Sequence, residues 1–123
     1  MGKFVIKQSN SGYSFSLKAS NGATIAVSQT YSELDSCRNG VQSVMNNAPV
    51  ANFEDQTVAG FEVQKHPKFE LYKDKSEQFR FRLKARDGEI IVVGEAYTTK
   101  ANCKNGINSI MKNVVDAKIV EEF

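Results

Sequence analysis

The sequence predicts an α+β fold in which two tandem β-β-β-α-β repeats form one antiparallel sheet, with two helices packed on one face. Three observations support this prediction. Residues 31–47 return 66 positions later as residues 97–113, with the same Tyr, Cys, Asn-Gly, Ser and Met in register. Apolar and polar residues alternate ahead of each copy, as in a half-buried strand. Within each copy, apolar residues recur every three or four positions, as on one face of a helix.

The first repeat, residues 3–55, is expected to begin with three strands. They cover residues 3–8, 13–20 and 23–28, where apolar side chains recur at every second position. Asn21-Gly22 joins the last two strands and is predicted to form a two-residue type I′ turn, in which both residues have a positive φ. The side chains expected to face the core are Phe4, Ile6, Tyr13, Phe15, Leu17, Ala19, Ile25 and Val27.

One helix and a last strand complete the first repeat. Ser32 is expected to cap the helix, with Asp35 three residues later in the first turn. Pro49 is expected to end the helix, and a short strand follows over residues 50–54. The apolar stripe of the helix consists of Leu34, Cys37, Val41, Val44 and Ala48.

The second repeat, residues 68–122, follows the same plan after a connection over residues 56–67 that has no counterpart in the first repeat. The connection is expected to contain a strand-like piece at 61–64, and the chain to end in a strand over 117–122. One repeat buries too little apolar surface to fold alone, so residues 1–123 are expected to form a single domain. The inward side chains are expected to be Phe69, Leu71, Phe79, Phe81, Leu83, Ala85, Ile91 and Val93.

Each helix contains an Asn-Gly pair, Asn39-Gly40 and Asn105-Gly106. Gly inside a helix costs about 1 kcal/mol relative to Ala, so its return at the same place indicates a local requirement. The favoured interpretation is that Gly lets each helix lie close to the sheet or to the other helix. The alternatives are that the pair breaks the helix, or that the Asn amides hold a ligand.

The composition excludes several classes of function. The net charge of +2 is too small to indicate a nucleic-acid partner from bulk charge, and no apolar run approaches the roughly 20 residues that span a bilayer. With no apolar signal sequence at the start, a cytoplasmic protein without a membrane role is expected. We expect a monomer with internal pseudo-twofold symmetry, no cofactor and no metal.

The two cysteines and the single histidine do not form a recognisable site. Cys37 and Cys103 lie on the apolar stripes of their helices and are expected to be small buried hydrophobic residues rather than a disulfide or a nucleophile. His66 is expected to be an exposed residue of the connection. A zinc site needs about four Cys or His ligands, and no catalytic residue is predicted.

A row of cations in the second repeat is the sharpest functional signal. Arg80, Arg82, Lys84 and Arg86 alternate with apolar residues and are expected on one sheet face, about 7 Å apart. Tyr72 is expected beside them as a stacking surface. These cations either contact an anionic partner or pair across strands with Glu70, Glu89 or Glu95. Ile90 and Val92 are also expected to face outward there, as a contact surface or merely as good strand formers.

Two segments resemble a known family. Phe-Arg-Phe-Arg-Leu-Lys-Ala-x-Asp-Gly (79–88) and Tyr-x5-Cys-x-Asn-Gly-Ile-x-Ser-Ile (97–110) are similar to the YegP-like family of small bacterial proteins, in its two-copy form. The resemblance implies two β3-α-β units in one sheet, with the last strands exchanged between units. It implies no established activity, cofactor or catalytic residue. The first repeat departs from the pattern, with Ser14 and Ser16 in place of Arg80 and Arg82.

The sequence therefore predicts a binding or interaction module without enzymatic activity, which uses the outer sheet face of the second repeat. One alternative is a weak nucleic-acid binder that uses the four cations, and another is an enzyme of unknown reaction. The partner, a protein or a nucleic acid, is not identified by the sequence.

Overall fold

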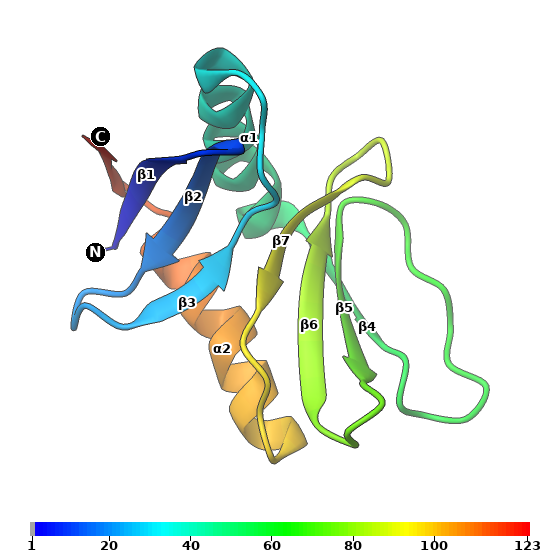
Figure 1. Cartoon of the computed structure of the whole chain (residues 1–123). Coiled ribbons are helices and arrows are strands. Elements are labelled where there is room, and N and C mark those ends of the chain that lie inside the picture. Colours follow the sequence, from blue (N-terminus) through cyan, green and yellow to red (C-terminus); the bar gives the residue numbers. More distant parts are fainter. Residues whose placement is uncertain (1) are drawn as a thin grey trace.

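Eight strands form one sheet in the computed structural model of the chain, which describes residues 2–123 (Figure 1). Among these residues, no helix is long and apolar enough to cross a bilayer. The first repeat contains β1 (Lys3–Ser9), β2 (Gly12–Lys18), β3 (Thr24–Val27), α1 (Leu34–Asn47), the short 3-10 helix η1 (Ala48–Val50) and β4 (Asn52–Asp55). The second repeat contains β5 (Lys68–Lys73), β6 (Phe79–Lys84), β7 (Ile90–Gly94), α2 (Lys100–Asn113) and β8 (Lys118–Glu122).

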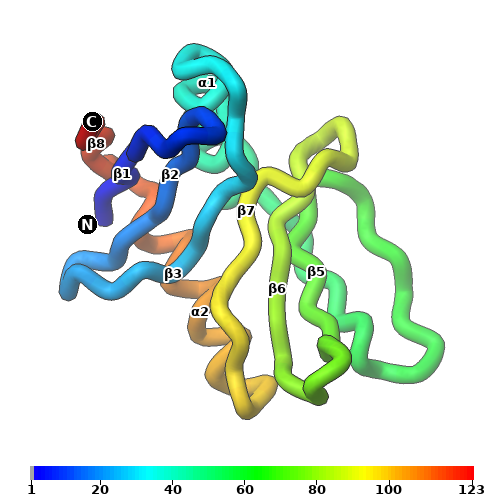
Figure 2. Tube along the Cα trace, in the orientation of Figure 1, coloured from blue at the N-terminus to red at the C-terminus, as the bar shows by residue number. Residues whose placement is uncertain are grey.

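The last strand of each repeat lies in the other half of the sheet. The strand order is β4-β5-β6-β7-β3-β2-β1-β8, so β4 of the first repeat pairs with β5, and β8 of the second repeat pairs with β1. The exchange of last strands implied by the family resemblance is therefore confirmed. The two halves meet at the antiparallel pair β3–β7, in the middle of the tube trace in Figure 2.

The prediction of an antiparallel sheet needs one correction at its edges. Hairpins join the strands within β1–β2–β3 and β5–β6–β7, and these pairs are antiparallel. The exchanged strands β4 and β8 instead run parallel to their neighbours. Each of them is entered through a helix that crosses the sheet, and such a crossover, unlike a hairpin, allows parallel pairing.

The two hairpin turns differ from the predicted type I′ turns. Only the Gly of each pair has a positive φ, +89° at Gly22 and +86° at Gly88. The Gly22 amide donates to the Ala19 carbonyl and the Ala19 amide to the Ala23 carbonyl, both at 2.9 Å. Equivalent bonds surround Gly88. These are the bonds of a three-residue loop closed by a bulge, which puts one extra residue into the return strand.

The bulge changes which residues of the return strands face the core. The register shifts in both hairpins, and Ala26 and Val92 take the inward positions, each only 1% exposed. Val27 and Val93 pair with each other on the outer face. The predictions that these two face inward and that Val92 faces outward are therefore wrong, whereas Ile90 does face outward, with 43% of its surface exposed.

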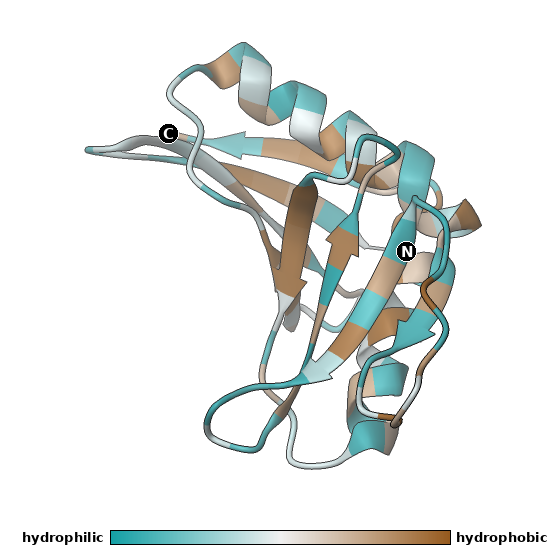
Figure 3. Cartoon of the chain, turned by 90° about the vertical axis from the view of Figure 1, so that its right-hand side faces the viewer, coloured by the Kyte–Doolittle hydropathy of each residue, from teal (hydrophilic) through white to brown (hydrophobic). Residues whose placement is uncertain are grey.

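Both helices cover the same face of the sheet, and the apolar core lies between them and the strands (Figures 1 and 3). Helix α1 begins after Glu33, so the predicted cap at Ser32 is wrong. Tyr31 is still bonded to Tyr13 as an extended bridge, which delays the start of the helix. In α2, the Thr99 side chain caps the helix by accepting a hydrogen bond from the Asn102 amide.

The Gly of each Asn-Gly pair is a site of close packing. Both helices continue through it, so the alternative that the pair breaks the helix is wrong. A Cβ atom on Gly40 would lie 2.5 Å from the Tyr31 hydroxyl and 3.0 Å from the Phe15 ring. Gly106 meets the equivalent aromatic pair in the second repeat. The prediction of close packing onto the sheet is therefore confirmed.

Candidate functional site

The outer face of the sheet differs sharply between its two halves. One row of residues crosses all eight strands on this face, and in the second half it places Glu54, Glu70 and Arg82 side by side on β4, β5 and β6. The repeat-related positions in the first half hold Val120, Val5 and Ser16. Within this row, the charged side chains are therefore a property of the second half and not of the fold.

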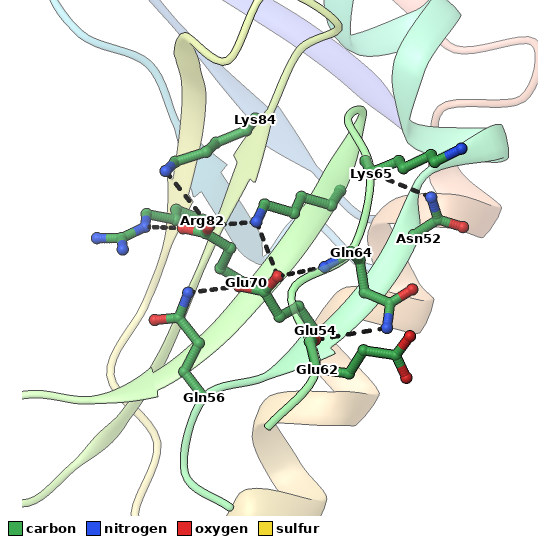
Figure 4. A network of polar contacts seen from close by, with 10 residues as sticks. Asn52, Glu54, Gln56, Glu62, Gln64, Lys65, Glu70, Arg82 and Lys84 are labelled. Atoms are coloured by element: carbon green, nitrogen blue, oxygen red, sulfur yellow. Dashed lines mark hydrogen bonds and ion pairs between the residues drawn. The ribbon is translucent and has the colours of Figure 1, made fainter. Parts of the chain in front are cut away.

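The acidic side chains of this row belong to a buried ion cluster. Lys68 Nζ lies 2.8 Å from Glu54 Oε1 and 3.1 Å from Glu70 Oε2. Glu70 also accepts the Arg82 Nε–H, and its carboxylate lies 3.3 Å from Lys84 Nζ (Figure 4). Glu54, Lys68 and Glu70 are at most 4% exposed. Every member thus has an opposite charge beside it, as buried charges require.

The connection between the repeats closes over this cluster. Gln56 donates its side-chain amide to Glu54 Oε2 at 2.6 Å, and the Gln64 backbone amide donates to Glu54 Oε1 at 2.7 Å (Figure 4). The Asn52 amide holds the connection further along by donating to the Lys65 carbonyl. The connection is therefore a cover on the sheet, and the strand expected at 61–64 does not form.

Hydrogen bonding controls the charge state of the cluster. Burial by itself would raise the pKa of Glu54, but hydrogen bonds from Gln56, Lys68 and Gln64 lower it to about 2. Burial also opposes ionisation of Glu70, and bonds from Arg82, Lys68 and Lys84 lower its pKa as well. Both carboxylates are therefore ionised at neutral pH and fully engaged in holding cations.

This cluster changes the expected row of cations. Arg82 and Lys84 are paired with Glu70, one of the three acids named from the sequence, and neither Glu89 nor Glu95 forms an ion pair within residues 2–123. Arg80 lies 3.9 Å from Asp74 and donates to the Gly94 carbonyl.

Arg86 stands apart from the other three cations. It lies beyond the end of β6, in the hairpin turn, and it is exposed. Together with Ser43, Asn46 and Asn47 of α1, it lines a separate hollow of about 520 Å³. The outer face therefore presents a row of three cations, two of which share one buried carboxylate.

A larger hollow opens at one end of this charged face. Its volume is about 670 Å³, within the range of small-molecule pockets. The connection, strands β5 and β6, and the first residue of α2 together form its walls. Its lining consists of three cations, three aromatic residues and two polar residues: Lys73, Arg82, Lys100, Phe61, Tyr72, Phe79, Gln56 and Thr57.

Cations and rings are already arranged against each other in this hollow. The Arg82 guanidinium carbon lies 4.5 Å from the centre of the Tyr72 ring, and Lys73 Nζ lies 5.4 Å from that of Phe79. Lys100 is held by Asp55 of the exchanged strand at 3.0 Å. The two terminal nitrogens of Arg82 form no hydrogen bond with any residue from 2 to 123, and they point away from Glu70 (Figure 4).

The other residues considered from the sequence lie elsewhere. Cys37 and Cys103 are buried and unpaired, and burial raises the pKa of the Cys103 thiol to about 11, which disfavours the thiolate. His66 is exposed near Gly88, and Asn39 and Asn105 are exposed on their helices. Within residues 2–123, no group of Cys, His, Asp and Glu is arranged to hold a metal ion.

Sequence reasoning placed Tyr72 and Arg82 on this face but missed the hollow beside them. Its other residues come from the connection, from the inner-face positions of β5 and β6, and from the start of α2. The one available signal was the connection itself, an insertion with exposed apolar residues such as Phe61 and no counterpart in the first repeat.

Comparisons with known proteins give a consistent family but no activity. A family described as "Domain of unknown function (DUF1508)" matches residues 8–55 and 74–121. The UPF0339 protein YegP of Yersinia pestis is 39% identical over 114 residues, covering 92% of this chain and 88% of that protein. A UPF0339 protein of Treponema denticola is 65% identical over 54 residues, covering 44% of this chain and 93% of that protein.

Two solved structures share the fold. The solution NMR structure of a UPF0339 protein from Shewanella oneidensis has a TM-score of 0.79 at 27% identity and covers 98% of this chain and 90% of its own. That of yegP from E. coli, described as a protein of unknown function, has a TM-score of 0.79 at 28% identity and covers 98% and 92%.

Proposed function

Because this chain belongs to the DUF1508 family, for which no function is stated, we propose one from the geometry of the second repeat: it is a non-enzymatic binding module for an anionic partner. The observation that carries the proposal is the hollow at the end of the outer face. Three of its eight lining residues are cations, three are aromatic, and none is a carboxylate. An anion placed there meets cations that are already positioned by ring contacts.

The state of the nearby acids supports binding rather than catalysis. A general acid or base works best with a pKa near neutrality. The pKa values of Glu54 and Glu70 are lowered, away from neutrality, and both carboxylates are fully used in ion pairs. Their arrangement suits a rigid support that positions Arg82 and Lys84 for contact with a partner.

The site, formed by the second repeat and the connection, has no counterpart in the first repeat. The positions related to Tyr72, Lys73, Arg82 and Lys100 in the first repeat hold Lys7, Gln8, Ser16 and Leu34. The first repeat therefore provides matched replacements for these four residues at equivalent positions of the fold.

The proposal is tested by binding of inorganic polyphosphate at low and at moderate salt. Lys73→Gln together with Arg82→Ser lowers the net charge from +2 to 0. We expect affinity to fall at least tenfold, since a hydrogen bond to a charged group contributes about 1.5–3 kcal/mol. The control, Lys3→Gln with Lys7→Gln, lowers the net charge equally in the other half of the sheet. Equal losses in both variants, or no binding by the unmodified chain, would contradict the proposal.

A weak nucleic-acid binder that uses Arg80, Arg82, Lys84 and Arg86 is a second candidate. The free terminal nitrogens of Arg82 and the exposure of Arg86 favour it, and the pairing of Lys84 with Glu70 weakens it. Replacing all four cations with Ser should abolish salt-dependent binding to nucleic-acid probes. If the unmodified chain fails to bind single- and double-stranded probes at low salt, this candidate is excluded.

A further inference from the structure

We propose that the hollow accepts one nucleotide unit, a flat base joined to a phosphate. This inference rests on the proposed function and makes it specific, because it names the chemical class of the anion. It draws on the three features that the hollow combines: exposed ring faces, unpaired guanidinium nitrogens and a free amide acceptor.

The rings are the first step. Phe61 is 38% exposed on the connection, and Tyr72 is only partly buried on β5, although both line the same hollow. Packing in the core does not account for either ring. Tyr72 lies on the sheet face opposite the helices, and Phe61 lies on the connection. One face of the Tyr72 ring is covered by the Arg82 guanidinium. Rings that are partly exposed in a hollow offer their remaining surface to a nucleic-acid base, which can stack there whatever its sequence. A bare anion would leave them in contact with water.

The phosphate is the second step. Arg82 is held at three places: its Nε–H by Glu70, its guanidinium plane by Tyr72, and its backbone by β6. Its two terminal nitrogens are left as a fixed fork, and this geometry matches two oxygens of a phosphate. Lys73 adds a second cation to the lining of the same hollow. A phosphate bonded by Arg82 thus lies next to the Tyr72 ring, as in a nucleotide whose base is stacked there.

The edge of the base is the third step. Gln56 donates its amide to Glu54, which fixes the orientation of the side chain and leaves its carbonyl oxygen as an acceptor. Figure 4 shows this oxygen directed away from Glu54. The Thr57 hydroxyl likewise donates to Asp55 and keeps its own lone pairs. Acceptors on this wall suit the exocyclic amino group of a base. A base inside a duplex has no free faces, so the unit is either a free nucleotide or part of a single strand.

The experiment compares probes that differ only in the base. Isothermal titration calorimetry with adenosine monophosphate and with ribose 5-phosphate presents the same phosphate with and without a ring. We expect adenosine monophosphate to bind at least tenfold more tightly. Tyr72→Leu, which removes the ring but keeps apolar volume, should weaken its binding about 5- to 100-fold. Binding of ribose 5-phosphate should weaken much less, because it loses only the ring contact that holds the Arg82 guanidinium. Tyr72→Phe should retain the affinity for adenosine monophosphate.

An eight-nucleotide adenine strand and its duplex distinguish the two sources of the nucleotide. Tighter binding of the single strand than of the free nucleotide assigns the unit to a polymer, and equal binding assigns it to a free nucleotide. The inference would be overturned by any of three results. These are equal binding of duplex and single strand, equal binding of adenosine monophosphate and ribose 5-phosphate, or equal affinity of the Tyr72→Leu and unmodified chains for adenosine monophosphate. If polyphosphate still binds in those cases, the proposed function stands without it; if no anion binds, both fail.

Discussion

At the scale of single residues, the duplicated side chains are explained by packing. Gly40, Tyr31 and Phe15 form one contact, and the same three residue types recur at the equivalent positions of the second repeat. The Tyr ring stacks on the Phe ring at a centroid distance of 6.4 Å, and its hydroxyl end fills the space that a side chain on Gly40 would need. The Gly and the Tyr are therefore a matched pair, retained together in both copies.

This pairing predicts the outcome of a rescue experiment. Gly40→Ala should lower the free energy of unfolding by about 1–2 kcal/mol, because an overpacking cost of about 2–3 kcal/mol outweighs the gain of about 1 kcal/mol in helix propensity. Adding Tyr31→Phe removes the hydroxyl at 2.5 Å and should restore part of the loss. Urea denaturation followed by circular dichroism measures both changes.

The exposed neighbour Asn39 provides the control for the helix itself. Asn39→Ala should be neutral or slightly stabilising, because Ala is the better helix former and the Asn side chain forms no hydrogen bond within residues 2–123. A stability of Gly40→Ala equal to that of the unmodified chain would show that the helix can move away from Tyr31.

At the scale of elements, the sequence predicts strands and helices well but not their fine register. Alternation identified β2 and β6 correctly, and helical spacing identified α1 and α2, because these patterns are local. The three-residue turns at Gly22 and Gly88 were missed because Asn-Gly and Asp-Gly suit two turn lengths, and only the bonds formed after folding decide between them. One extra residue in each return strand then shifted the register, so Ala26 and Val92 face inward while Ile25 and Ile91 stay buried as predicted.

The connection illustrates a second limit. Two of its contacts with the sheet join residues that are 10 and 13 positions apart, the Gln64 amide with Glu54 and the Lys65 carbonyl with Asn52. No periodicity in the sequence encodes such contacts. The charged residues themselves were visible in the sequence, and pairing of the cations with Glu70 was one of its two interpretations. The burial of Glu54, Lys68 and Glu70 beneath the connection was not visible. The sequence consequently predicted the sheet face on which the candidate site lies, but not the hollow or most of the residues that line it.

The cluster beneath the connection predicts how stability depends on pH. The folded state lowers the pKa of Glu54 to about 2 from the ordinary 4.5, so folding favours the ionised form. This stabilisation is complete above about pH 4.5 and is lost as the pH falls toward 2. At 1.36 kcal/mol per pKa unit, a shift from 4.5 to about 2 corresponds to a loss of roughly 3 kcal/mol. Folding also lowers the pKa of Glu70, so its contribution to stability is likewise lost at low pH.

The comparison with Glu54→Gln isolates this contribution. At pH 7 the variant should be less stable by about 1–3 kcal/mol, since Lys68 keeps one carboxylate partner in Glu70. The difference from the unmodified chain should shrink between pH 4.5 and pH 2, as Glu54 itself becomes protonated. Urea titrations at several pH values measure it. A difference that stays constant down to pH 2 would mean that the Glu54 carboxylate is not held by this cluster.

At the scale of the whole molecule, the exchange of β4 and β8 makes each half dependent on the other. Phe4 and Val5 of β1 are covered partly because β8 lies along this strand, and β4 covers the corresponding edge of β5. Ion pairs strengthen both exchanges: Arg38 of α1 forms two hydrogen bonds to Glu121 of β8, and Lys100 of α2 pairs with Asp55 of β4. The duplication thus produced one core rather than two linked ones.

This dependence predicts the behaviour of separated halves. A fragment of residues 1–60 contains β4 but not the β5 edge on which it lies, and a fragment of residues 61–123 contains β8 but not β1. Each should be largely unfolded or self-associated, because an unpaired strand and an uncovered apolar face are both unfavourable. Mixed in equal amounts, they should form a one-to-one complex with the circular dichroism spectrum of the intact chain. Size-exclusion chromatography with light scattering should give a one-to-one complex the mass of one intact chain, 13.7 kDa. If either fragment instead folds alone as a stable monomer, the exchanged strands are not needed to complete the core, and the two repeats are independent folding units.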